Sequence, residues 1–179
     1  MKKQRNSSRR LALYMAEGGL IAALYVVLTM LVNAVGLANY PIQLRLSEAL
    51  CILPVFTPAA IPGLFIGCLL ANLFGQCIWQ DIVFGSLATL VGAVGTYLIG
   101  KMLLHRPRLC GTLSGIPAVL ANTLIMPPIL KFAYMLPGNV WYFYLTVGIG
   151  EVLSAWLLGL VLFMALYTRR DKIFRANHL

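Results

Sequence analysis

The chain has 179 residues, of which 60% are hydrophobic and only 11% are charged, and its mean hydropathy is +0.86. Because soluble domains carry about 25% charged residues, this composition excludes an ordinary soluble fold and indicates an integral membrane protein. The net charge of +9 comes mainly from basic clusters at residues 2–10, 101–108 and 169–175. Such clusters flank membrane helices on the cytoplasmic side, so we expect contact with the lipid bilayer and none with nucleic acid.

Six apolar segments follow one another, and each is expected to form a membrane helix, which needs ~20 residues to cross a bilayer. They lie at about residues 11–35, 42–56, 63–78, 82–104, 109–134 and 140–167. Pro127 and Pro128 are expected to break the fifth segment in its middle. The prediction is an all-α membrane protein with one domain over residues 1–179, whose basic ends cover about 1–10 and 168–179.

An even number of spans places both termini on the same side of the membrane. The basic loop between the fourth and fifth segments falls on that side too, so all three basic clusters predict cytoplasmic termini. The connections near residues 36–45, 76–81 and 130–139 are then on the outer side, with Arg45 and Lys131 as their cations.

Neither a metal site nor a cofactor is expected from the sulfur and imidazole side chains, which are Cys51, Cys68, Cys77, Cys110, His105 and His178. The cysteines lack CxxC spacing and indicate packing residues. Residues 95–101 match the GxxxxGK pattern of a phosphate loop, but Met102 follows where Ser or Thr is needed. Lys101 is expected to be an interfacial lysine, and the chain offers no ATP site of its own.

Four of the five acidic residues lie in or at the ends of apolar segments, namely Glu17, Glu48, Asp81 and Glu151. A charge at the centre of a membrane helix costs about 2.5–3.5 kcal/mol, so such residues usually mark functional sites. Glu48, Asp81 and Glu151 are expected to line one pocket that opens to the outside, with Asn122 and Trp79 as neighbours. The alternative is a set of ion pairs that hold helices together, most simply Arg45 with Glu48.

Two stretches are distinctive: "RLSEALCILPVFTPAAIPGLFIGCLLANL" from Arg45 and "DIVFGSLATLVGAVGTYL" from Asp81. They resemble the queuosine-precursor transporter (QueT) family, which are substrate-binding S components of energy-coupling-factor (ECF) vitamin transporters. The resemblance covers most of the chain and implies a six-helix fold in the cell membrane without enzymatic activity. It implies capture of a deazaguanine, such as preQ1, preQ0 or queuine, from outside. It also implies that a transmembrane coupling subunit (EcfT) and two ATPase subunits (EcfA-type) supply the energy.

S components commonly carry an AxxxA motif on the first helix, where the coupling subunit packs. The candidate pairs here are Gly19 with Ala23 as the closest register, Ala12 with Ala16, and Gly18 with Ala22. Small residues at this spacing let helix backbones approach closely. Gly63 and Gly67 form another such pair, for which we expect a packing role.

A deazaguanine presents two adjacent donors, the ring N–H and the exocyclic amine, which match a carboxylate acceptor. We assign this role to Glu151 first, Asp81 second and Glu48 third. The remaining site candidates are Arg45 at the pocket mouth, Asn122 and Lys131, and Trp79 or Tyr142 for stacking on the ring. The competing functions are a proton-coupled carrier that uses Glu151 as its proton site, and a small membrane enzyme. The enzyme is disfavoured because neither clustered Asp residues nor an HExxH motif occurs.

Overall fold

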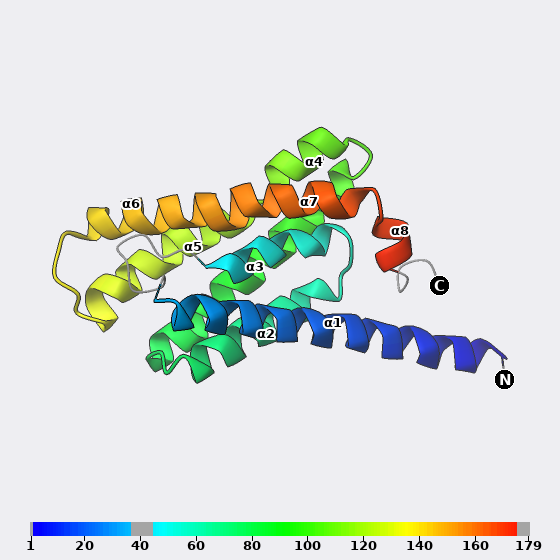
Figure 1. Ribbon diagram of the computed structural model, residues 1–179, viewed down its shortest axis with the longest axis horizontal. Helices are drawn as coiled ribbons and strands as arrows, with labels where there is room; N and C mark the ends of the chain where they lie inside the picture. The colour runs from blue at the N-terminus through cyan, green and yellow to red at the C-terminus, as the bar shows by residue number, and fades with distance from the viewer. Residues whose placement is uncertain (1, 37–44, 175–179) are drawn as a thin grey trace.

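Helices make up all the regular structure in the part of the chain that the computed structural model describes, which is residues 2–36 and 45–174. Its elements are α1 (Lys2–Ala34), the 3₁₀ helix η2 (Leu46–Val55), α2 (Ala60–Phe74), α3 (Trp79–Leu103), α4 (Pro107–Ser114), α5 (Ile116–Pro128), the π-helix η3 (Ile129–Ala133), α6 (Val140–Glu151), the π-helix η4 (Val152–Leu158), α7 (Gly159–Tyr167) and α8 (Arg170–Ile173). The all-α prediction is therefore confirmed for these residues (Figure 1).

The six apolar segments form helical rods in the predicted order, but the rods differ in length. Four are long and apolar enough to cross a membrane: Ser8–Ala34, Trp79–Leu103, Pro107–Ala133 and Val140–Tyr167. The other two, η2 and α2, fall short of this length, although each segment was expected to form a membrane helix. At ~2.0 Å per residue in a 3₁₀ helix and ~1.5 Å in an α-helix, η2 and α2 reach only ~20 Å and ~22 Å. The hydrocarbon core of a bilayer is ~30 Å thick.

Pro127 and Pro128 do not break the fifth rod, contrary to the prediction. They lie at the end of α5, and the chain continues directly into the π-helical turn η3. Proline removes a backbone donor and its ring crowds the carbonyl four residues earlier, so widening the next turn relieves the crowding without ending the helix. The interruption lies instead at Gly115, between α4 and α5.

The short helix η2 lies at the centre of the bundle, and most of its residues are buried. It contacts α1, α2, α3, η4 and α7. A 3₁₀ helix of ten residues is uncommonly long, and such stretches mark strain or a functional hinge. Because other helices surround η2, its sequence is almost continuously apolar, and Ser47 and Glu48 are its buried polar residues.

Small residues bring α1 and α2 together, as expected for Gly63 and Gly67. A Cβ atom on Gly63 would lie 2.6 Å from the carbonyl oxygen of Gly18, and one on Gly67 would lie 3.0 Å from that of Ala22. Both distances are shorter than a carbon atom tolerates, so glycine is required at this contact. Gly18 and Ala22 therefore face α2 within the protein.

The basic segments gather toward one end of the bundle. In Figure 1 the start of α1 (blue), α4 (green) and α8 (red) lie toward the same end, whereas the turn between α5 and α6 lies at the opposite end. The described residues nearest the two termini therefore lie toward one end of the bundle, and the predicted cytoplasmic location of the termini stays a prediction.

Candidate functional site

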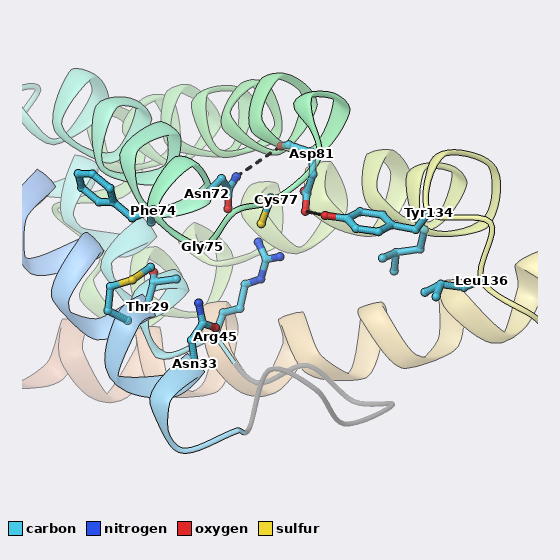
Figure 2. Close-up of a pocket in the computed structure, with 13 residues that line it drawn as sticks. Thr29, Asn33, Arg45, Asn72, Phe74, Gly75, Cys77, Asp81, Tyr134 and Leu136 are labelled. Atoms are coloured by element: carbon cyan, nitrogen blue, oxygen red, sulfur yellow. Dashed lines mark hydrogen bonds between the residues drawn. The ribbon is translucent and has the colours of Figure 1, made fainter.

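A cavity of about 470 Å³ lies at the end of the bundle away from the basic segments. The last turns of α1 and α2, the first turn of α3 and the segment after η3 surround it (Figure 2). Its lining residues are Thr29, Met30, Asn33, Arg45, Ala71, Asn72, Phe74, Gly75, Cys77, Asp81, Leu130, Tyr134 and Leu136. Sites for small molecules usually have volumes of ~300–1,000 Å³, so the cavity has the size of a site for a small organic ligand.

Asp81 is the acidic residue that lines this cavity. It lies in the first turn of α3, where the helix dipole favours a negative charge, and only 3% of its surface is exposed. Its Oδ2 atom accepts a hydrogen bond of 2.9 Å from the Tyr134 hydroxyl. Its Oδ1 atom is buried and has no hydrogen-bond partner among the described residues. A buried acceptor without a partner is unfavourable, so Oδ1 is ready to accept from a ligand.

Tyr134 fixes the position of this carboxylate. Its hydroxyl donates to Asp81 and accepts a hydrogen bond of 3.4 Å from the backbone nitrogen of Ile78. Burial, and after it the nearby charge of Asp81, raises the pKa of Tyr134 above its ordinary value. The phenol therefore keeps its proton at neutral pH and remains a donor to Asp81.

Gly85 leaves room for the polar groups beside the cavity. A Cβ atom at this position would lie 3.1 Å from Nδ2 of Asn72 and 3.2 Å from Oδ1 of Asp81. The Asn72 amide donates to the backbone oxygen of Asp81 at 3.4 Å. The glycine one turn after Asp81 thus helps to keep both side chains in place.

Arg45 contributes the guanidinium of the cavity. Its side chain points into the space beneath Asn72 and Cys77 (Figure 2), and its backbone nitrogen donates to the Ser154 hydroxyl at 3.2 Å. The negative charges of Asp81 and Glu48 both act on the guanidinium. The cavity therefore presents one cationic donor group and one anionic acceptor group.

Glu48 lies deeper, in a network that joins three helices. Its side chain is 1% exposed and accepts hydrogen bonds from the Tyr25 hydroxyl, from the Cys51 thiol at 3.2 Å and from the Asn122 amide at 3.4 Å. Neither Glu48 nor Asn122 lines the cavity. Because these donors come from α1, η2 and α5, the Glu48 carboxylate links these three helices next to the cavity.

Glu151 lies between this network and the cavity. It is 8% exposed and adjoins a narrow space with a free volume of about 10 Å³, lined also by Arg45, Met126, Leu130 and Val147. Its Oε2 atom has no hydrogen-bond partner in the described part of the chain, and the carboxylate interacts with Glu48, Arg45 and Asn122. The space is too small for a ligand, and Arg45 and Leu130 line both this space and the cavity.

The expected stacking residues lie outside the cavity lining. Trp79 is 65% exposed and Tyr142 is 47% exposed. The Lys131 ammonium donates to the backbone oxygen of Leu136 at 3.4 Å, next to the lining but not in it. The sequence did not point to five polar lining residues as site candidates, which are Thr29, Asn33, Asn72, Cys77 and Tyr134; Cys77 was expected only to be a packing residue. Asn72, like Asn122, is an amide side chain within an apolar segment, and this pattern could have indicated it as a site candidate.

The candidate docking residues on α1 separate into two faces. Ala12, Ala16, Gly19 and Ala23 are exposed, and a Cβ atom on Gly19 would meet nothing within 4 Å. Gly18 and Ala22 are buried against α2. The Gly19–Ala23 and Ala12–Ala16 pairs therefore share one outward face, whereas the Gly18–Ala22 pair packs against α2 inside the protein.

Comparison with known proteins identifies the family. The family model described as "QueT transporter" matches residues 15–168. The chain belongs to the QueT transporter family. It is 40% identical over 72 residues to the queuosine precursor transporter QueT of Lactococcus lactis subsp. cremoris (strain MG1363). The aligned residues are 40% of this chain and span only 42% of that relative. No solved structure is matched at a significant level.

Family membership and the helices agree on the class of protein. The resemblance to QueT proteins is confirmed, and the chain belongs with transporters and not with membrane enzymes. With four helices long enough to span a bilayer, it is a multi-pass protein of the cell membrane.

Proposed function

We propose that this protein is the substrate-capture (S) component of an ECF importer and binds a 7-deazaguanine precursor of queuosine from the outer side. The ligand would be preQ1, preQ0 or queuine. The observation that carries this proposal is Oδ1 of Asp81, a buried acceptor without a described partner in a cavity of about 470 Å³. The family match supplies the class of cargo, since the similar Lactococcus protein is named a queuosine precursor transporter.

The chemistry of the cavity suits a guanine-like ring. The ring N–H and the exocyclic amine donate to the Asp81 carboxylate, which has acceptor capacity left after its bond to Tyr134. The Arg45 guanidinium donates to the ring carbonyl. All three hydrogen bonds are charge-assisted and therefore about twice as strong as neutral ones. An analogue that lacks these groups leaves buried charges unpaired and is rejected.

The orientation supports capture from outside. The basic segments gather at the end of the bundle opposite the cavity, and basic flanks face the cytoplasm. Both termini are then cytoplasmic, and the cavity opens toward the outer face. The two short helices η2 and α2 complete a six-helix S-component bundle around it.

The energy comes from partner subunits in this proposal. The exposed small residues of α1, which are Ala12, Ala16, Gly19 and Ala23, form the docking face for the coupling subunit (EcfT). Two ATPase subunits (EcfA-type) bind that subunit. Small side chains suit a close contact between helices within the membrane.

Purified protein and whole cells test the two halves of the proposal separately. The protein alone is titrated calorimetrically with preQ1, preQ0, queuine, guanine and adenine. We expect binding of the deazaguanines and none of adenine, which lacks the carbonyl and the ring N–H donor. Uptake of the bound compound by cells should stop when the ATPase subunits are removed. Absence of binding would refute the ligand assignment, and uptake without the ATPases would refute the S-component role.

A proton-coupled carrier is the second candidate, favoured by one observation. Glu151 is buried next to Glu48, and paired intramembrane carboxylates occur in proton pathways. Proteoliposomes that contain only this chain distinguish the candidates. Uptake driven by a pH gradient would support the carrier, whereas an S component alone should bind ligand without accumulating it.

A further inference from the structure

A groove of about 500 Å³ lies between α4 and α7, at the basic end of the bundle and apart from the ligand cavity. It is lined by Pro107, Arg108, Thr112, Leu160, Phe163, Met164 and Tyr167. In Figure 1, α4 and α1 lie on opposite sides of the bundle. The groove is therefore distinct from the small-residue face of α1.

Close packing of α4 on α7 shapes the floor of the groove. A Cβ atom on Gly111 would lie 2.8 Å from Cδ1 of Phe163 and 3.1 Å from Cδ1 of Leu160. The indole nitrogen of Trp156 donates to the backbone oxygen of Thr112 at 2.7 Å. These contacts fix α4 relative to the rod of η4 and α7, so the fold determines the shape of the groove.

The surface around the groove is suited to an acyl chain. Leu157, Val161 and Met164 on the α7 rod are exposed, as is Leu113 on α4. Both helices belong to rods long enough to cross the bilayer. The apolar lining therefore continues along the helices toward the membrane interior.

The end of the groove carries positive charge. Arg108 lines it and is exposed, and Arg106 and His105 are exposed in the adjacent turn. Basic pockets between membrane helices on the cytoplasmic side attract anionic lipid head groups. Arginine also pairs well with phosphate because its fork of donors matches two oxygens.

We propose that this groove binds one anionic phospholipid, with an acyl chain packed between α4 and α7 and the phosphate accepting hydrogen bonds from Arg108. A lipid fits better than a protein segment because the apolar lining runs along the membrane axis and ends at the level of the basic residues. The inference does not depend on which ligand occupies the cavity at the other end.

Native mass spectrometry of the detergent-solubilised protein tests the proposal. The protein is titrated with phosphatidylglycerol or with phosphatidylcholine of the same acyl chains. One basic residue near anionic lipid contributes ~1 kcal/mol, or about fivefold in affinity. We expect phosphatidylglycerol to bind about fivefold more tightly, and Arg108→Gln to remove this preference. Arg9→Gln is the matched control, an exposed arginine of α1 at the same end, and should retain it.

A second variant tests the acyl-chain part of the groove. Met164→Trp fills the lining and should weaken binding of both lipids, whereas Arg108→Gln affects only the anionic one. Equal losses in Arg108→Gln and Arg9→Gln would overturn the proposal in favour of diffuse charge attraction. Loss of coupling-subunit co-purification in Arg108→Gln without any change in lipid binding would also overturn it, because the groove would then be a protein interface. Deazaguanine binding should remain unchanged in all three variants.

Discussion

The Tyr134 hydroxyl donates to Oδ2 of Asp81 at 2.9 Å and leaves Oδ1 of the same carboxylate buried in the cavity lining without a described partner. The two residues are 53 positions apart in sequence, and both line the cavity. One oxygen is thus used to hold the carboxylate, and the other is available to a ligand. This division of roles is what makes Asp81 the best candidate for ligand recognition.

Tyr134→Phe should weaken deazaguanine binding by about tenfold. The change removes one hydrogen bond to a charged group, which contributes ~1.5–3 kcal/mol, and frees Asp81 to rotate. Calorimetric titration of the purified variant measures the loss. Tyr144→Phe removes a half-buried hydroxyl outside the cavity lining and should bind as the parent does. Equal affinities for the two variants would show that Tyr134 does not position Asp81.

Glu48→Gln should destabilise the protein more than Glu151→Gln does. Glu48 accepts from three donors, and a glutamine would turn one acceptor into a donor that faces a donor. We expect a loss of roughly 1–3 kcal/mol in the free energy of unfolding. Glu151 has no hydrogen-bond partner at Oε2 among the described residues, so Glu151→Gln should change stability less. Thermal unfolding in detergent compares them, and a larger shift for Glu151→Gln would contradict this account of the network.

The sequence was sufficient to predict the membrane class and the order of the helices. Both follow from the lengths of the apolar runs and from the positions of the charges along the chain. An ionisable residue beside an apolar segment indicates a functional site, and this pattern made Asp81 and Arg45 candidates, whose roles in ligand binding stay predictions. The segments that form η2 and α2 were expected to be membrane helices like the other four, because apolar residues buried inside a bundle resemble residues facing lipid.

The ranking of the acids depended on information that sequence does not contain. Glu48, Asp81 and Glu151 look alike in the chain, but only Asp81 lines the large cavity. Tyr134 reaches it from the segment after η3, a contact between distant residues that no spacing rule indicates. Trp79 was expected to stack on the ligand, yet it lies two positions before Asp81 on α3, and residues two positions apart on a helix face different directions.

The two faces of α1 predict opposite phenotypes for neighbouring residues. Gly19→Leu with Ala23→Leu changes the exposed face, so ligand binding should survive while partner co-purification and uptake are lost. Gly18→Leu with Ala22→Leu instead changes the buried face, where a Cβ atom on Gly18 would already lie 3.1 Å from the backbone oxygen of Ala59 and where Ala22 packs against Gly67. This second variant should fail to fold or lose ligand binding. If the first variant also loses binding, the exposed face is needed for folding and not for docking.

Thiol labelling in intact cells tests the orientation. Cys77 is the half-buried cysteine at the cavity end of the bundle, whereas Cys51, Cys68 and Cys110 are buried, so Cys77→Ser provides the background. A cysteine at Asn139 should react with a membrane-impermeant reagent. A cysteine at Arg108 should react only after the cells are opened. Labelling at Arg108 from outside would reverse the proposed orientation.

The most direct test of the central claim is calorimetric titration of the parent protein, Asp81→Asn and Glu151→Gln with preQ1. Asparagine keeps the shape of Asp81 but removes the charge and places a donor where the ligand donates. The substitution removes a charge-assisted hydrogen bond and leaves a buried group unpaired. Together these changes should weaken the binding free energy by about 3 kcal/mol, or roughly 100-fold in affinity. We expect Asp81→Asn to lose affinity for preQ1 by this factor and Glu151→Gln to lose much less, while both proteins remain folded. Parent-like binding by Asp81→Asn, with the loss in Glu151→Gln instead, would contradict the central claim.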